Sequence, residues 1–563
     1  MERSVAAPRT GHLPAMSQKE PSRKPRPRGG AADKRKPAPA AHAKHQGDLV
    51  PLLFPIIPLV FYIATCCRSI GLGDTALLMM EERELILSTE VNNHNATVLL
   101  GHIVSWLPLH NNAFEANLAS AIGGAIAISL LFYVIYRMTA SAATAAITAT
   151  ITMVSHSMWW HSTIAEVYAL NAMFMFLGLG MLADLHRSFS EKKLRVLFFI
   201  CGLAFFQHVQ LGILLAGACT FLLVHGLQSE KEPVKWIVRA GTRCVSAFAL
   251  GFIPYLVLLI HDSVKYGFLD VVSRATGGQF HSIMFKANWG RAIPDVLFLI
   301  GLQFPGVYLV AIVAGIVLMA RAWRGSPALY ALALMFCVNT LFFMTFDTWD
   351  RFAFLLPSFL MLSFAASFAV DALVRRARGR PALAAAVAAL WVLAVGAPIY
   401  LYAHTARWGR DPQSVWHRHY NNDYTANNYD QAEYTANPNR RNYRDVTYFA
   451  EELFRKLPRN SVLLDTDSRT LYPLRYIQTY ENQRPDIKLR LYNSWGFSNW
   501  GVSPEQVLDG FDEAYQRRAN LFITTTDHPF KELIDVANTK RDYHFEKYPL
   551  DDRLYIYRLA VPK

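Results

Sequence analysis

The stretch VLFFICGLAFFQHVQLGILLAGACTFLLVHGL, residues 196–227, decides how this chain is built. Its 32 residues are too many for one membrane span of about 20 residues, and polar side chains interrupt it in the middle, at Gln207 and His208. Segments rich in Lys and Arg lie on both sides of it, at residues 187–195 and 231–243. Because Lys and Arg accumulate in short cytoplasmic loops, both flanks belong on the same side of a membrane. The stretch therefore predicts two short helices that turn at Gln207 and His208.

Nine further apolar runs have about the length of a membrane span. They lie near residues 49–68, 114–136, 142–160, 167–184, 243–261, 293–319, 328–346, 352–374 and 382–402. Together with the hairpin they predict about eleven spans, with the N-terminus in the cytoplasm and the C-terminus on the opposite side, because the basic segments then all face the cytoplasm. The composition, 52% hydrophobic and 18% charged, agrees with a mainly α, polytopic membrane protein and excludes an ordinary soluble enzyme.

Residues 1–46 form a basic tail with eleven Lys and Arg and three acidic residues. The tail is rich in Pro, Ala and Gly and has no apolar period, which predicts disorder. A basic tail can bind nucleic acid, but the span that follows at once favours a cytoplasmic tail near anionic lipid head groups. We therefore expect membrane lipids, and not nucleic acid, as its partner.

The rest of the chain divides into three parts. Residues 47–403 hold the predicted transmembrane bundle, and residues 404–443 are polar and rich in Tyr and Asn, which predicts an irregular linker packed on that bundle. Residues 444–563 alternate short apolar runs with helical stretches, which predicts a soluble, extracytoplasmic α/β domain with a small parallel sheet. Its strands are expected at residues 462–464, 487–492, 521–524 and 554–557.

Asp74 begins the first loop on the non-cytoplasmic face. The sequence Gly71-Leu-Gly-Asp74 follows the first predicted span directly. A carboxylate fixed at the end of a rigid helix suits a general base that acts on a substrate arriving from that face. The same residue also fits the N-cap of a helix that begins at Thr75. The residues alone leave base and cap open.

Two later turns on the same face carry further ionisable residues. The first holds Glu166, Tyr168 and Asn171 within two helical turns. An aromatic belt at the membrane surface accounts for Tyr168, but an acid such as Glu166 is costly there unless it has a function. The second holds Asp350 and Arg351, where the guanidinium either binds a phosphate or pairs with Asp350 as a structural clasp.

Several motifs follow one another in an order that resembles a known family. They are Gly73-Asp74, Leu99-Leu-Gly-His102, Ala165-Glu-Val-Tyr-Ala-Leu-Asn171, Gly202-Leu-Ala-Phe-Phe-Gln-His208 and Asp350-Arg-Phe-Ala-Phe-Leu-Leu-Pro-Ser358. The order is similar to that of bacterial membrane proteins known only as a domain of unknown function, and of protein O-mannosyltransferase-like proteins of the GT-C glycosyltransferase superfamily. The resemblance implies a GT-C fold, in which a multispan bundle takes a sugar from a polyprenyl or dolichyl phosphate.

The resemblance also implies an inverting displacement at the anomeric carbon of that sugar. Asp74 would remove the proton from an acceptor hydroxyl, and Glu166 would lie in the same site. The departing phosphate needs positive charge or hydrogen-bond donors, for which Arg351, His102 and His208 are the candidates. The implied donor is a mannosyl lipid phosphate, the implied acceptor is a protein Ser or Thr hydroxyl, and no metal or other cofactor is expected.

One segment departs from the family pattern. Family members carry His-Pro-Pro-Gly-Tyr-Pro before the Leu-Leu-Gly-His string, whereas residues 90–95 read Glu-Val-Asn-Asn-His-Asn. Glu90 and His94 are the candidates to replace the missing His. The departure keeps three alternatives open: a lipid or glycan acceptor, a transporter or flippase, and an inactive scaffold of the same fold. The expected location is the bacterial inner membrane, or the endoplasmic reticulum in a eukaryote.

The predicted topology puts all these candidates on one face of the membrane, opposite the basic tail. Asp74, Glu166 and Asp350 come from distant parts of the sequence. Because ionisable residues near a membrane usually face a cavity or one another, we expect these three to share one pocket.

Overall fold

The computed structural model describes residues 49–89, 94–278, 284–286, 288–346, 348, 350–409, 411, 430–465, 468–491, 511–513, 516–517, 520–524 and 544–560. The predicted basic tail, residues 1–46, lies outside the described residues. So do Glu90 and residues 412–429 of the predicted linker. Within the described part the chain is mainly helical, with one five-stranded sheet near its C-terminus.

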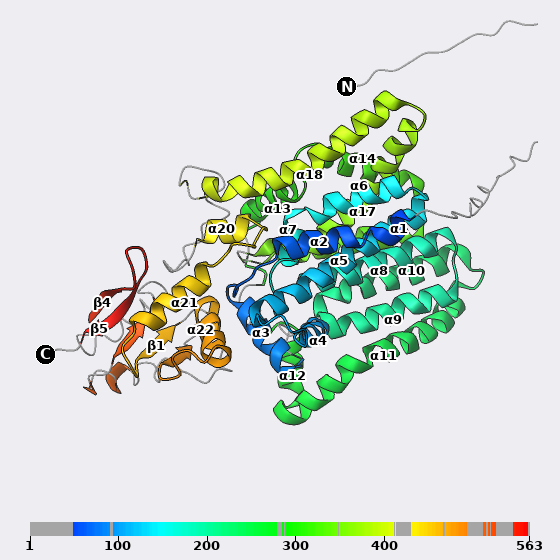
Figure 1. The fold of residues 1–563 in the computed structure, drawn as a ribbon. Coiled ribbons are helices and arrows are strands. Elements are labelled where there is room, and N and C mark those ends of the chain that lie inside the picture. Colours follow the sequence, from blue (N-terminus) through cyan, green and yellow to red (C-terminus); the bar gives the residue numbers. More distant parts are fainter. Residues whose placement is uncertain are drawn as a thin grey trace, which may run out of the picture. The chain divides into compact units, whose positions relative to one another are not determined.

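Helices occupy all the apolar runs that the sequence predicts as spans (Figure 1). They are α1 (Val50–Leu53), α2 (Ile56–Thr65), α5 (Asn112–Thr139), α6 (Ala142–Met153), α7 (His156–His161), α8 (Tyr168–Arg187), α9 (Glu191–Gln207), α10 (Gly212–Ser229), α11 (Pro233–Tyr266), α13 (Trp289–Gln303), α14 (Val307–Ala322), α15 (Pro327–Met344), α17 (Leu356–Ala377) and α18 (Pro381–Gly409). The mainly α membrane bundle is thereby confirmed.

Not all of these helices are long enough to cross a membrane alone. Seven of the described helices have the length and apolar composition for it, or eight if α13 and α14, which meet at a bend of 107°, make one span. The run containing α1 and α2 (Val50–Thr65), α4 (Asn95–Val104) and α6 are shorter apolar helices. The count of about eleven spans and the orientation of the termini stay predictions.

The predicted hairpin at Gln207 and His208 is confirmed. Helix α9 ends at Gln207, a short 3₁₀ turn spans Val209–Leu211, and α10 begins at Gly212. His208 leaves the helix in an extended conformation (φ −166°, ψ 135°), and its Nδ1 accepts a hydrogen bond from the backbone N–H of Gln210. The turn therefore lies at the polar residues in the middle of the apolar stretch, and the His208 side chain stabilises it.

Two glycines let α9 and α11 approach closely. A Cβ at Gly202 would lie 2.2 Å from the carbonyl oxygen of Phe248, and one at Gly251 would lie 2.2 Å from that of Phe199. Small residues at facing positions allow membrane helices to pack backbone against backbone. This contact requires glycine on both helices.

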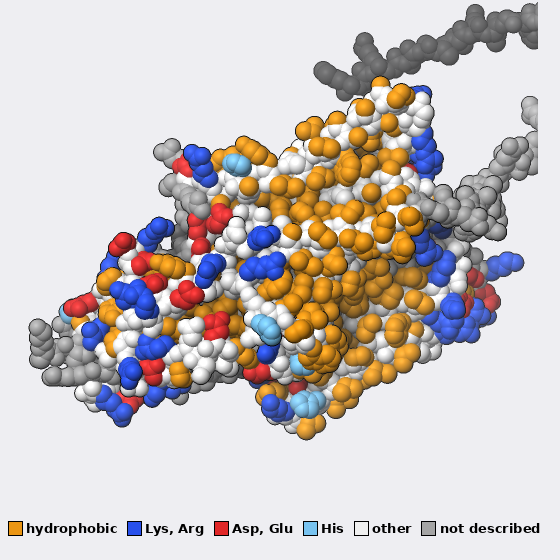
Figure 2. Space-filling view, in the orientation of Figure 1, with side chains coloured by type: hydrophobic (Ala, Val, Ile, Leu, Met, Phe, Trp, Pro, Cys, Tyr) orange, Lys and Arg blue, Asp and Glu red, His pale blue; other side chains and the backbone are white. Residues whose placement is uncertain are grey.

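The outer surface of the bundle is apolar. Large aliphatic side chains are well exposed on several helices, including Val245 on α11 (62%), Val310 on α14 (72%) and Val392 on α18 (64%). Figure 2 shows hydrophobic side chains over a broad continuous area, with Lys and Arg gathered at one end of it. Since a soluble monomer rarely exposes a patch of this extent, the surface faces lipid, and the chain is a multi-pass membrane protein.

The C-terminal part contains a mixed sheet and not the purely parallel one that the sequence predicts. Its strands are β1 (Val462–Asp465), β2 (Lys488–Leu491), β3 (Leu521–Ile523), β4 (His544–Pro549) and β5 (Tyr555–Ala560), in the order β2-β1-β3-β5-β4. Strands β1, β2 and β3 are parallel, as predicted. Strand β5 pairs antiparallel with β3, and β4 pairs antiparallel with β5. The sequence analysis missed β4, an edge strand with mostly exposed side chains and therefore a weak apolar signal.

Helices α21 (Asp445–Lys456) and α22 (Ser468–Tyr480) accompany this sheet (Figure 1). The expected irregular linker at residues 404–443 is partly helical, which corrects the prediction. Helix α18 continues to Gly409, with His404 bonded back to the carbonyl of Tyr400, and α20 occupies Gln431–Ala436. The carboxylate of Asp430 accepts the N–H of Glu433 and so caps α20.

Residues 434–443, which we name the C-terminal strap, lie against the ends of α2 and α7. The hydrogen bonds that join the strap to the bundle include His156 Nε2 to Thr435 O (2.8 Å), Trp160 Nε1 to Tyr434 O (2.9 Å), Thr163 Oγ1 to Pro438 O (2.8 Å) and Arg440 N to Thr65 O (2.9 Å). Arg440 is fully buried, with its guanidinium 4.3 Å from the centre of the Tyr434 ring. The strap is therefore packed and hydrogen-bonded against the membrane domain.

Candidate functional site

Asp74 lies at the first position of α3 (Asp74–Glu84), on the loop that leaves α2. Gly73 before it has φ +60° and ψ −122°, a left-handed conformation that suits glycine. Gly73 occupies the cap position and the helix includes Asp74, so the alternative of Asp74 as cap of a helix beginning at Thr75 does not hold. The carboxylate is exposed, at a helix end where negative charge is favourable.

One buried asparagine holds this loop beside the segment that carries Glu166. The Asn117 amide nitrogen donates to the carbonyls of Cys67 (3.2 Å) and Ser69 (3.0 Å), in the loop before Asp74. The amide oxygen of the same side chain accepts the backbone N–H of Ala165 at 2.6 Å. Asn117 therefore joins the two segments directly.

Glu166 itself is fixed through its backbone. Its N–H donates to Ser120 Oγ at 3.0 Å, and this hydroxyl donates to the Glu166 carbonyl at 2.9 Å. Ser120 and Asn117 are neighbours on the same face of α5, one turn apart. The side chain of Glu166 is 17% exposed.

Three carboxylates from distant parts of the chain interact at this place. Burial raises the pKa of Glu166 well above its usual range, and the nearby charges of Asp74 and Asp350 raise it further. Burial also raises the pKa of Tyr434 on the strap, and Glu166 adds to that rise. The structure thus brings Asp74, Glu166 and Asp350 together, as the sequence analysis expects, and adds the strap to them.

His161 stands next to this acid group, although the sequence analysis did not single it out. Its Nδ1 lies 3.9 Å from Glu166 Oε2, and its side chain is 1% exposed. Neither ring nitrogen has a hydrogen-bond partner within the described part of the chain. A buried imidazole with unused nitrogens beside a largely buried carboxyl is available for a bound ligand.

A row of rings leads from His161 to the hairpin. His161 and Tyr168 have ring centres 4.6 Å apart, Tyr168 and His208 6.2 Å, and His208 stacks on His94 at 4.5 Å. Burial lowers the pKa of His208 to about 4 and that of His94 well below its usual range. Both imidazoles are therefore neutral near pH 7, and because His208 Nδ1 accepts a hydrogen bond, its proton lies on Nε2.

The whole fold has counterparts among solved structures. ArnT from Cupriavidus metallidurans bound to undecaprenyl phosphate matches with a TM-score of 0.58 and 13% identity, over 92% of this chain and 99% of that one. The same protein in the apo state matches with a TM-score of 0.56 and 14% identity, over 91% and 99%. The chain has the GT-C fold. At this identity the likeness concerns the fold alone.

Sequence comparison finds similarity to protein O-mannosyl-transferases. Residues 96–232 match the family model of the protein O-mannosyl-transferase TMEM260 N-terminal domain. Protein O-mannosyl-transferase TMEM260 of Mus musculus is 24% identical over 312 residues, which cover 52% of this chain and 43% of the mouse protein. The chain therefore spans less than half the length of this curated relative. The resemblance to O-mannosyltransferase-like GT-C proteins is confirmed.

The side chain of Asn171 supports the hairpin. Its amide oxygen accepts Gln207 Nε2 at 3.0 Å, and Gln207 Oε1 accepts the N–H of Thr97 at 3.0 Å. Gln207 Nε2 also donates to the carbonyl of Val167 at 3.1 Å. This network fixes the start of α8 against α4 and the hairpin, and thereby positions Tyr168 and His208.

His102 and Arg351 are engaged in contacts that the sequence did not predict. His102 Nδ1 lies 3.0 Å from the carbonyl oxygen of Glu82 on α3. Arg351 is buried and forms an ion pair with Asp295 of α13 (3.1 Å), while its Nε and Nη2 donate to the carbonyl of Phe346. Arg351 therefore pairs with Asp295 and not with Asp350 as the clasp interpretation expects, and its contact with a substrate phosphate stays a prediction.

Proposed function

We propose that this chain is a membrane glycosyltransferase that moves a sugar from a polyprenyl or dolichyl phosphate to an acceptor hydroxyl with inversion. The observation that carries the proposal is the group of Asp74, Glu166 and Asp350, in which Asn117 joins the segments of the first two. A relative named protein O-mannosyl-transferase supports mannose as the sugar and a protein hydroxyl as the acceptor. A GT-C structure with undecaprenyl phosphate bound supports the lipid phosphate donor.

The environments of Asp74 and Glu166 favour different roles. Asp74 is exposed at a helix N-terminus, where negative charge is favourable and a carboxylate can meet an acceptor hydroxyl. Glu166 is largely buried, and its burial and the charges of Asp74 and Asp350 raise its pKa, which favours the protonated form. Two carboxyl groups in such different environments can divide the tasks of base and hydrogen-bond donor between them.

The proposed reaction is a single displacement. Asp74 takes the proton of the acceptor hydroxyl as its oxygen forms the new bond to the anomeric carbon. The bond from that carbon to the phosphate oxygen breaks, and its electron pair leaves with the lipid phosphate. The neutral Glu166 carboxyl and His208 Nε2–H donate hydrogen bonds to the substrates and need no metal or other cofactor for this.

Substitution of Asp74 tests the proposal. Asp74→Asn keeps the size of the side chain but removes the base, so transfer should fall by about 10² to 10⁴-fold. Asp552→Asn, an exposed acid of the C-terminal domain, is the matched control and should transfer like the wild type. The assay uses purified protein with labelled dolichyl phosphate mannose and separates label in protein, lipid and glycan fractions. Equal transfer by Asp74→Asn and wild type would remove Asp74 from the mechanism.

A further inference from the structure

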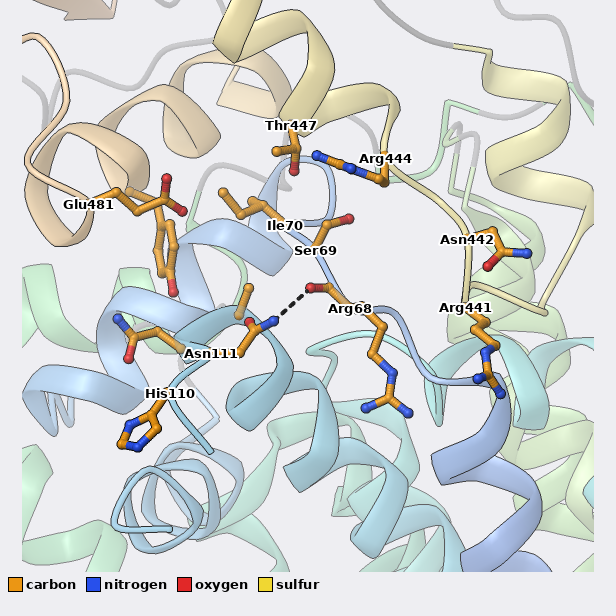
Figure 3. A pocket seen from close by; sticks show the side chains of 13 residues that line it. Arg68, Ser69, Ile70, His110, Asn111, Arg441, Asn442, Arg444, Thr447 and Glu481 are labelled. Atoms are coloured by element: carbon orange, nitrogen blue, oxygen red, sulfur yellow. Dashed lines mark hydrogen bonds between the residues drawn. The ribbon is translucent and has the colours of Figure 1, made fainter. Parts of the chain in front are cut away.

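A polar pocket of about 600 Å³ lies between the first loop, the start of α5 and the C-terminal part (Figure 3). Its charged lining consists of Arg68, Arg441 and Arg444 against the single carboxylate of Glu481, with His110 in addition. Asp74, Glu166 and Asp350 do not line it. The pocket is therefore cationic and separate from the proposed reaction centre.

Two of its arginines hold the same helix end. Arg68 Nη2 donates to the carbonyl of Ile63 at 3.2 Å, and Arg441 Nη1 donates to that of Ala64 at 3.5 Å. These carbonyls are consecutive at the C-terminal end of α2, so the two guanidinium groups lie side by side (Figure 3). Arg68 is held further by the Phe114 ring, 3.7 Å from its guanidinium carbon.

The paired charges have no counter-charge among the described side chains. No ion pair joins Arg68 or Arg441 to a described carboxylate, whereas Arg444 has Glu451 at 3.5 Å. Glu481 lies at the other side of the pocket in Figure 3. Two adjacent guanidinium groups repel each other unless an anion binds both, and their planar forks suit a phosphate.

An apolar track on α2 leads to the same place. Ile56, Ile57 and Val60 are 54%, 49% and 60% exposed. They lie on one face of the helix, and Ala64, whose carbonyl Arg441 holds, is exposed one turn further along that face. A hydrocarbon chain lying on this face would bring its head group to Arg68 and Arg441.

We propose that this pocket binds the head group of an anionic phospholipid of the bilayer. The phosphate lies between Arg68 and Arg441, the polar part of the head group contacts Asn111 and Asn442, and the acyl chains lie along α2. A phospholipid fits better than the polyprenyl donor because none of the three grouped acids reaches the pocket. Since Arg441 belongs to the C-terminal strap, the bound lipid ties the strap to α2.

Lipid binding to the purified full-length chain tests this inference. Protein in uncharged detergent is titrated with phosphatidylglycerol, phosphatidylcholine and polyprenyl phosphate, and bound lipid is counted by native mass spectrometry. The wild type should retain one phosphatidylglycerol more tightly than phosphatidylcholine. The double substitution Arg68→Gln with Arg441→Gln should weaken that binding about tenfold or more, because two charge-assisted contacts are lost.

Single substitutions guard against a folding defect. Arg441→Gln alters only an exposed side chain, and it should weaken phosphatidylglycerol binding while the protein elutes as the wild type does. Arg455→Gln, on the outer face of α21, is the control that should leave binding unchanged. The inference is overturned if the double variant binds phosphatidylglycerol like the wild type. It is also overturned if the substitutions weaken only polyprenyl phosphate binding, because the pocket would then belong to the donor. The readout is binding, so the result is independent of the proposed transfer.

Discussion

At the scale of single residues, Asn117 joins two segments of the proposed site with one side chain. Its one amide holds the loop before Asp74 and the segment of Glu166. Because misplacing reacting groups by about 1 Å can cost 10²-fold in rate, Asn117→Ala should lower transfer by about 10 to 100-fold. The variant also leaves buried carbonyls unpaired, which should cost about 1–3 kcal/mol of stability.

Asn339→Ala separates these two effects. Asn339 is a buried amide that donates to Ser358 Oγ at 2.9 Å, between α15 and α17. We expect a similar loss of thermal stability from it but near-normal transfer. If both variants lose transfer in proportion to the decrease in their melting temperatures, then Asn117 affects transfer only through the stability of the fold.

Glu166 should make both activity and stability depend on pH. Its pKa in the folded chain lies above the ordinary value of 4.5, so the folded state binds this proton more tightly than the unfolded state does. The stabilisation is complete below about 4.5 and is lost as pH rises toward the raised pKa. Transfer should fall over the upper part of the same range as Glu166 ionises.

Glu166→Gln provides the comparison for this pH effect. The amide stays neutral and still donates hydrogen bonds, so the alkaline fall in transfer and the corresponding fall in melting temperature should both disappear. Profiles of transfer and melting temperature between about pH 5 and 9 measure this. Identical profiles for wild type and Glu166→Gln would show that Glu166 does not titrate in this range.

At the scale of elements, the contact between α9 and α11 leaves no room for a side chain at Gly251. An added Cβ would lie 2.2 Å from a backbone oxygen, so Gly251→Ala should separate the helices and cost about 1–3 kcal/mol. Gly241→Ala on the same helix is the control, because its Cβ would meet only Leu222 at 3.8 Å. Thermal unfolding in detergent should show a lower midpoint temperature than that of the wild type for Gly251→Ala but not for Gly241→Ala.

Elements were the easier part to predict from sequence. The apolar runs and the polar pair Gln207 and His208 define helices and their turn locally, within a few residues. Strand β4 was missed because its exposed side chains carry little apolar pattern. The α20 helix was missed because a short helix capped by Asp430 resembles a polar linker.

The site could be predicted from sequence only at positions where the residue type is energetically unfavourable near a membrane unless it has a function. Asp74, Glu166 and Asp350 drew attention because acids are expensive near a membrane. The partner of Arg351 is 56 residues away in sequence, and no local pattern indicates Asp295. Tyr434 joins the site because His156 and Trp160, the neighbours of His161 in sequence, hold the returning strap, and these contacts depend on the complete fold.

At the scale of the whole molecule, the predicted topology places the acids and the basic end on opposite sides of the membrane. In a Cys337→Ser background, an impermeant maleimide should label His110→Cys from the non-cytoplasmic side and Lys192→Cys from the cytoplasmic side of sealed vesicles. Both positions are exposed. Labelling of both from one side would contradict the predicted arrangement.

The strap has a consequence for how the protein matures. Residues 434–443 reach back to Thr65 and Trp160, which leave the ribosome hundreds of residues earlier. A nascent chain can insert all its predicted spans before the strap exists, but Tyr434 and the other strap residues join the proposed reaction centre only after translation has passed residue 443. On the proposed function, a growing polypeptide in the membrane therefore transfers no sugar until the strap has been synthesised.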